Sequence, residues 1–234
     1  MSFEPQTVMV TGAAGNLGQA VAAAFAAQGA RLVLLDRQVD SLRAVFGEAG
    51  ADRLFLPADL LDAQQVAAAL AAAVGRFGRV DVLCNLAGGF RMGEAVHETS
   101  NSTWDFLQDI NVRTLLSMVR AVVPHMLESG GGKIVNVGAF AAQKGMAHMG
   151  AYCAAKSSVM RLTEAMAAEL REKNINVNCV LPTIIDTPEN RAAMPDADPS
   201  RWVAPKDLAS VIVFLASAAA HAVHGVTLPV TGLS

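Results

Sequence analysis

The chain has 234 residues, a length at which one α/β domain can bury a single core, so we expect one domain over residues 1–234. The net charge of −3, with no cluster of Lys and Arg, excludes the basic surface of proteins that bind nucleic acids or anionic membranes. Cys84, Cys153 and Cys179 have neither disulfide-framework nor metal-ligand spacing, so we expect reduced thiols, a cytoplasmic protein and no metal.

Neither end of the chain fits a targeting signal or a membrane anchor. Residues 1–6 lack the basic and apolar stretches of a signal peptide. The apolar block 208–220 is too short to span a bilayer, and is better explained by a buried helix. We therefore expect no signal peptide and no membrane partner.

Short apolar, β-branched runs alternate along the chain with longer stretches of helical periodicity, and no internal repeat or linker divides them. Repeated strand–helix–strand units predict the α/β class: a single doubly wound Rossmann domain with a seven-stranded, mainly parallel sheet and helices on both faces. Such folds bind ligands beyond the carboxyl ends of the strands. The predicted strands are residues 7–10, 31–36, 53–56, 80–85, 133–137, 175–181 and 226–230.

Capping signals predict where several helices begin and end. Gly29 is expected to end the first helix, and Asp62 to cap the helix after the third strand. Ser102 and Asp105 resemble a capping box that opens a long helix over residues 102–128. Pro205 fits the first turn of a late helix.

A glycine-rich turn follows the first predicted strand and opens directly into a helix. It contains Gly12, Gly15 and Gly18, and Asp36 ends the next strand. Small residues let the backbone approach a pyrophosphate, the helix N-terminus binds its charge, and a carboxylate accepts the ribose hydroxyls. Asp36 would repel a 2′-phosphate, so NAD is favoured over NADP, with neighbouring Arg37 partly offsetting the repulsion.

Three further motifs follow in order: Asn85-Leu86-Ala87-Gly88 after the fourth strand, Asn111 within a helix, and Tyr152 four residues before Lys156. Tyr and Lys at this spacing lie on one helical face, where the ammonium can favour the ionised phenol. Together with the glycine turn, these motifs resemble the short-chain dehydrogenase/reductase family over essentially the whole chain.

The resemblance implies an NAD-linked oxidoreductase that transfers a hydride to or from a small organic substrate. Tyr152 would give or take the proton, Lys156 would lower the pKa of Tyr152 and bind the nicotinamide ribose, and Asn111 would hold a relay water. Asn111 can equally be a helix-bending core amide. Family members commonly form homodimers or homotetramers. The cofactor-binding residues would be Gly12, Gly15, Asn16, Leu17, Gly18, Asp36, Arg37, Asp59, Leu60, Asn85, Ala87, Gly88, Tyr152, Lys156, Pro182, Ile185 and Thr187.

The sequence departs from the usual family pattern at two positions. Asn16 stands where most simple members carry glycine, and Ala139 stands where a serine normally hydrogen-bonds the reacting carbonyl oxygen. Losing one such donor typically costs about 10²–10³ in rate. An ordinary alcohol or ketone reaction would therefore need a substitute for the serine.

Within the family, the chain has a narrower resemblance to dihydropteridine reductases. The similarity lies in the glycine spacing, the Ala-Gly-Gly-Phe segment 87–90, the missing serine and the stretch 181–202. It implies a quinonoid dihydropterin as acceptor, with Phe90 and Trp202 flanking the flat ring, unless these aromatics only fill the core or a subunit contact. Segment 189–204 is expected to be a loop that covers the substrate, and Ala139 and His148 are further candidates to face it.

Overall fold

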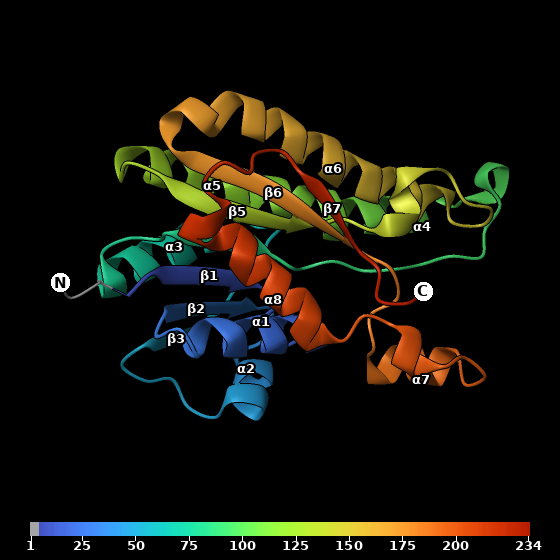
Figure 1. Ribbon diagram of the computed structural model, residues 1–234, viewed down its shortest axis with the longest axis horizontal. Coiled ribbons are helices and arrows are strands. Elements are labelled where there is room, and N and C mark those ends of the chain that lie inside the picture. Colours follow the sequence, from blue (N-terminus) through green and yellow to red (C-terminus); the bar gives the residue numbers. More distant parts are fainter. Residues whose placement is uncertain (1–4) are drawn as a thin grey trace.

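The computed structural model describes residues 5–234, so residues 1–4, which belong to the segment inspected for a signal peptide, lie outside the described residues. Seven strands form one sheet in the order β3-β2-β1-β4-β5-β6-β7 (Figure 1), and every neighbouring pair is parallel. The predicted doubly wound Rossmann fold is confirmed. The strands are β1 (Thr7–Thr11), β2 (Arg31–Asp36), β3 (Arg53–Pro57), β4 (Val82–Asn85), β5 (Gly132–Val137), β6 (Ile175–Pro182) and β7 (Thr227–Val230).

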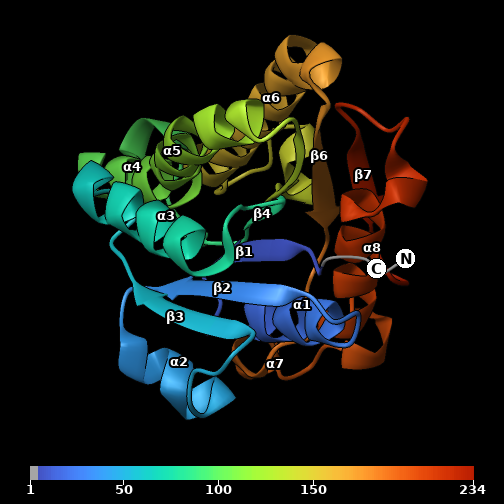
Figure 2. The same ribbon diagram turned by 90° about the vertical axis from the view of Figure 1, so that its left-hand side faces the viewer.

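Helices cover both faces of the sheet (Figure 2). Parallel strands need such crossover helices, and their burial on both faces explains why the strands are almost continuously apolar. One face carries α1 (Asn16–Ala26), α2 (Val39–Phe46) and α8 (Pro205–Ala216), and the other carries α3 (Ala63–Phe77), α4 (Asn101–Gln108), α5 (Thr114–Glu128) and α6 (Gly150–Leu170). The buried apolar side chains form two large clusters and a third, smaller one between α4 and α6.

The predicted helix boundaries are confirmed at two of three starts. The carboxylate of Asp62 accepts from the backbone N–H of Gln64, at 2.8 Å, and Pro205 is the first residue of α8. Helix α4, however, is capped by Ser100, whose hydroxyl accepts from Thr103 N, at 3.2 Å. The prediction that Ser102 opens this helix was two residues late, because Ser102 already lies within α4.

The long helix expected over residues 102–128 is interrupted. A π-helical turn, Asp109–Arg113, separates α4 from α5. Such wide turns bulge one residue out of the helical register, and they often occur at functional sites. In this chain the turn contains Asn111, which is 2% exposed.

The segment 189–204 contains more structure than the expected loop. Thr187 accepts from Asn190 N, at 3.2 Å, and caps the short helix α7 (Pro188–Ala193), which is followed by a 3₁₀ turn at Pro199–Arg201. The order Thr-Pro-Glu is a helix-start signal that the sequence contained. Helix α7 lies beyond the carboxyl end of β6 (Figure 1). Over residues 5–234, we find no helix that is both long and apolar enough to cross a membrane.

Candidate active site

The glycine turn after β1 is packed too tightly to accept side chains. Gly12 has a φ of +63°, and a Cβ there would lie 3.1 Å from the backbone of Ala87, after β4. A Cβ on Gly18 would lie 2.7 Å from the Cα of Ala13. These glycines keep the turn bare against the first turn of α1, as a pyrophosphate cradle requires.

A cleft of about 840 Å³ opens at the carboxyl ends of the strands, above this turn. It extends from the end of β2 past the turn to the segments that follow β4 and β6, which is where doubly wound sheets bind ligands. Most of the residues predicted to bind the cofactor line it: Gly12, Gly15, Asn16, Leu17, Gly18, Asp36, Arg37, Asp59, Leu60, Ala87, Gly88, Ile185 and Thr187. Asn85, Tyr152, Lys156 and Pro182 are not among its lining residues.

Two acidic residues lie at one end of the cleft. Asp36 accepts from the backbone N–H of Ala14, at 3.0 Å, so its carboxylate also holds the glycine turn. Asp59 accepts from Leu61 N, at 3.0 Å, within its own loop. The charge of Asp36 therefore stands in the wall of the cleft, next to the glycine turn.

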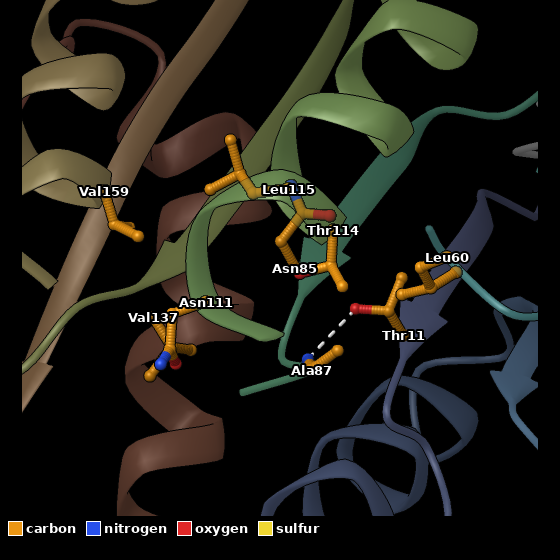
Figure 3. A pocket seen from close by; sticks show the side chains of 9 residues that line it. All are labelled: Thr11, Leu60, Asn85, Ala87, Asn111, Thr114, Leu115, Val137 and Val159. Carbon is orange, nitrogen blue, oxygen red and sulfur yellow. Dashed lines mark hydrogen bonds between the residues drawn. The ribbon is translucent and has the colours of Figure 1, made fainter. Parts of the chain in front are cut away.

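Thr11 is a structural residue of the site that the sequence interpretation missed. Its hydroxyl accepts from the backbone N–H groups of Leu86, at 3.0 Å, and Ala87, at 3.1 Å, which joins the ends of β1 and β4. Figure 3 shows the bond to Ala87. The only feature of the sequence that could have indicated this role is the position of the threonine, directly before the first glycine of the turn. The contact fixes the position of the Asn85–Gly88 motif relative to the turn.

Behind this motif lies a cavity of about 10 Å³, lined by Thr11, Asn85, Asn111 and Thr114 among others (Figure 3). That volume is about one water molecule. Asn85 donates to the side-chain oxygen of Asn136, at 2.9 Å, across the β4–β5 pair, and Asn136 donates to Thr163 of α6, at 2.9 Å. Asn85 thus has a structural role beneath the cleft, where it lines the small cavity and not the cleft itself.

The side chain of Asn111 clamps the loop after β4. Its oxygen accepts from Gly89 N, at 3.1 Å, and its amide donates to the carbonyls of Gly89, at 3.0 Å, and Leu107, at 3.1 Å. These bonds fit the interpretation of Asn111 as a core amide. The role of Asn111 in holding a relay water stays a prediction.

Lys156 is buried directly beside the cleft. A Cβ on Gly88, a cleft residue, would lie 3.2 Å from Lys156 Nζ. The ammonium donates to the carbonyl of Val137, at 2.9 Å. Burial lowers the pKa of Lys156 to about 8, and the neighbouring Cys179 thiol opposes that shift.

Tyr152 lies one helical turn before Lys156 on α6 and is partly covered by Phe90. The two rings meet edge to face, with centroids 4.8 Å apart. Burial raises the pKa of Tyr152 to about 12, with a smaller contribution from Cys153. The upward shift runs against the expectation that Lys156 lowers this pKa, and its largest cause is desolvation of the phenol.

The remaining candidates are spread around this centre. Ala139 is buried at the end of β5, and Phe90 is 53% exposed at the mouth of the site. His148 has a φ of +59° and lines a second, smaller cavity beside the start of α6. Trp202 is buried, and neither Trp202 nor Phe90 lines any of the three cavities described.

Replacing Gly18 by Ala is expected to abolish tight NADH binding, because the new methyl group would collide with the backbone of the turn. Dissociation constants from NADH fluorescence test this. Gly75→Ala is the matched control, since nothing lies within 4 Å of a Cβ at that helical position. Unchanged affinity in Gly18→Ala would show that the turn does not bind the pyrophosphate.

The Lys156→Met substitution is expected to change how stability depends on pH. In the unfolded chain this lysine keeps its proton up to a pKa of 10.5, whereas in the folded chain it loses it near 8, so the unfolded state binds more protons in between. Because protonation is linked to folding, the free energy of unfolding of the parent should rise relative to that of the variant as pH rises from about 8 to 10.5, by roughly 3 kcal/mol at most.

Urea unfolding at a series of pH values measures this difference. Lys173→Met, at an exposed lysine after α6, serves as control. Parallel stability curves for the parent and Lys156→Met would contradict the buried, destabilised ammonium.

Comparison with known proteins agrees with this geometry. Residues 6–198 match the family described as short chain dehydrogenase. D-threitol dehydrogenase of Mycolicibacterium smegmatis is 35% identical over 242 residues, covering 98% of this chain and 93% of that protein. The 3-ketoacyl-(acyl-carrier-protein) reductase of Brucella melitensis, solved with NADH, superposes with a TM-score of 0.87 at 32% identity, covering 99% and 98%. A dehydrogenase/reductase from Mycobacterium ulcerans superposes with a TM-score of 0.91 at 28% identity, covering 100% and 90%. The chain belongs to the short-chain dehydrogenase/reductase family and is an oxidoreductase of that type.

Proposed function

We propose that this oxidoreductase uses NAD(H) and that Tyr152 exchanges the proton with the substrate. One observation carries the proposal: Gly88 lines the cleft, and a Cβ at Gly88 would lie only 3.2 Å from Lys156 Nζ, so Lys156 borders the cleft one helical turn after Tyr152. The bare glycine turn and Asp36 at the other end fit the pyrophosphate and ribose of a dinucleotide. A nicotinamide dinucleotide, when bound, supplies or accepts the hydride.

The chain's own groups then account for the proton. Because the pKa of Tyr152 lies near 12, its phenol keeps its proton at neutral pH and is ready to give it to a reduced substrate. Lys156, still charged at neutral pH because its pKa is about 8, stabilises the phenolate that remains. Phe90 covers Tyr152 from outside and restricts the access of water.

The acceptor that we propose is a conjugated heterocycle such as a quinonoid dihydropterin. Support comes from Ala139, which places a buried methyl group where family members hold a carbonyl oxygen with a serine. An acceptor that is protonated on nitrogen does not need that serine. The exposed ring of Phe90 offers a flat apolar surface at the mouth of the site.

A second candidate is oxidation of an alcohol or reduction of a ketone with another donor in place of the serine. Its support is the similarity to D-threitol dehydrogenase. A non-catalytic dinucleotide sensor, the third alternative, leaves unexplained why Tyr152 and Lys156 are kept beside the cleft. The expected homo-oligomer and the cytoplasmic location remain predictions from the sequence.

Asp36→Asn is expected to lower the preference for NADH over NADPH by at least about tenfold, because the variant keeps a side-chain oxygen for Ala14 N but loses the charge. Dissociation constants for both dinucleotides, from fluorescence titration, give the ratio. Asp40→Asn, at an exposed position on α2, is the control. A parent enzyme that prefers NADPH would refute the assignment of NAD.

The two acceptor classes are separated by following NADH oxidation with quinonoid dihydropterin and with a panel of ketones. Tyr152→Phe should reduce turnover of the active class by about 10²–10⁴, the usual contribution of a positioned proton donor. Ala139→Ser should raise ketone turnover without raising pterin turnover. No pterin turnover in the parent removes the heterocycle proposal, and full activity of Tyr152→Phe removes the role of Tyr152.

A further inference from the structure

A second cavity, of about 220 Å³, lies beside the start of α6, and Ala151, the residue before Tyr152, belongs to its lining. Three segments build it: the loop after β4, the adjoining face of α4, and the residues that lead into α6. The loops are tied together, since Gly93 N donates to the carbonyl of His148, at 2.8 Å. The side chains that carry charge or can titrate in its lining are Arg91, Glu94 and His148.

Arg91 is held in place by an aromatic ring. Its guanidinium carbon stands 3.7 Å from the centroid of the Phe106 ring, on α4. Phe106 also lines the large cleft, so Arg91 stands near the boundary between the two cavities. Stacking uses the face of the guanidinium and leaves its in-plane N–H groups available as donors.

These donors have no partner in the part of the chain that the structure describes. No ion pair or side-chain hydrogen bond among residues 5–234 involves Arg91. The acid in the cavity, Glu94, is already engaged: its carboxylate accepts from Ser100 N, at 3.1 Å, and from the hydroxyl of Thr103, at 3.0 Å. Arg91 is thus an exposed cation, positioned by its stack on Phe106, whose guanidinium N–H groups meet no acceptor among the described residues.

We propose that Arg91 binds a carboxylate on the substrate, at the end remote from the reacting atom. The planar fork of a guanidinium matches the two oxygens of a carboxylate. Arg91 directly follows Phe90, whose ring packs against that of Tyr152, and the cavity shares no lining residue with the dinucleotide cleft. One molecule would thus place its reacting group at Tyr152 and its carboxylate at Arg91. The inference rests on the proposed function, and it narrows the proposed acceptors to those that carry a carboxylate.

Binding without turnover tests the proposal independently of the reaction. Isothermal titration calorimetry with NADH present compares cyclohexanecarboxylate with cyclohexanecarboxamide, which has the same shape without the charge. The parent should bind the carboxylate at least about tenfold more tightly. Arg91→Gln should remove that preference and leave carboxamide binding within about twofold, while Arg91→Lys should retain part of it.

Arg76→Gln is the matched control, because Arg76 also stands over an aromatic ring, that of Phe77, but lies on α3. Thermal melting shows whether loss of the stack on Phe106 has affected folding. The proposal is overturned if the parent does not prefer the carboxylate, or if a folded Arg91→Gln protein keeps the preference. Carboxylate binding that depends on Arg91, without turnover of any acceptor, would instead contradict the proposed function alone.

Discussion

The close approach of two backbone segments, at Gly12 after β1 and Ala87 after β4, is the constraint on which the rest of the site depends. A Cβ at Gly12 would be only 3.1 Å from Ala87, and Thr11 fastens the same two segments through its hydroxyl. β1 stands between β2 and β4 in the sheet, so the chain's crossovers run in opposite directions from this point. The connection after β1 leads to β2 on one side of β1, and the connection after β3 leads to β4 on the other side. The cleft lies where these two connections diverge.

A second set of contacts links this junction to the Tyr152–Lys156 pair. The π-helical turn moves Asn111 inward, where its amide holds Gly89 from both sides. Gly88 is thereby kept against Lys156, with no room for a side chain between them. The ammonium has lost much of its hydration in this position, which is why its pKa falls, and the neutral phenol of Tyr152 follows from the same burial.

Much of the fold and of the cleft could be predicted because the signals are local. Glycine spacing, the acid that ends β2 and the cap at Asp62 each follow from short-range sterics and hydrogen bonding. The features that could not be predicted depend on tertiary contacts. The π-helical turn exists because Asn111 satisfies the loop after β4, and the pKa of Tyr152 reflects what covers it. Ser100 rather than Ser102 caps α4 because Glu94 positions it, a contact across the loop that no spacing rule reveals.

The departure at Asn16 acquires a meaning from α7. The amide of Asn16, the first residue of α1, donates to the carboxylate of Glu189 at the start of α7, at 2.9 Å. The turn at one end of the cleft and the helix at the other therefore share a bond that glycine at position 16 would not provide. The two equilibria are therefore coupled. If a ligand at the turn weakens this bond, it shifts α7 away from its bonded position, and holding α7 in that position weakens binding of the ligand by the same factor.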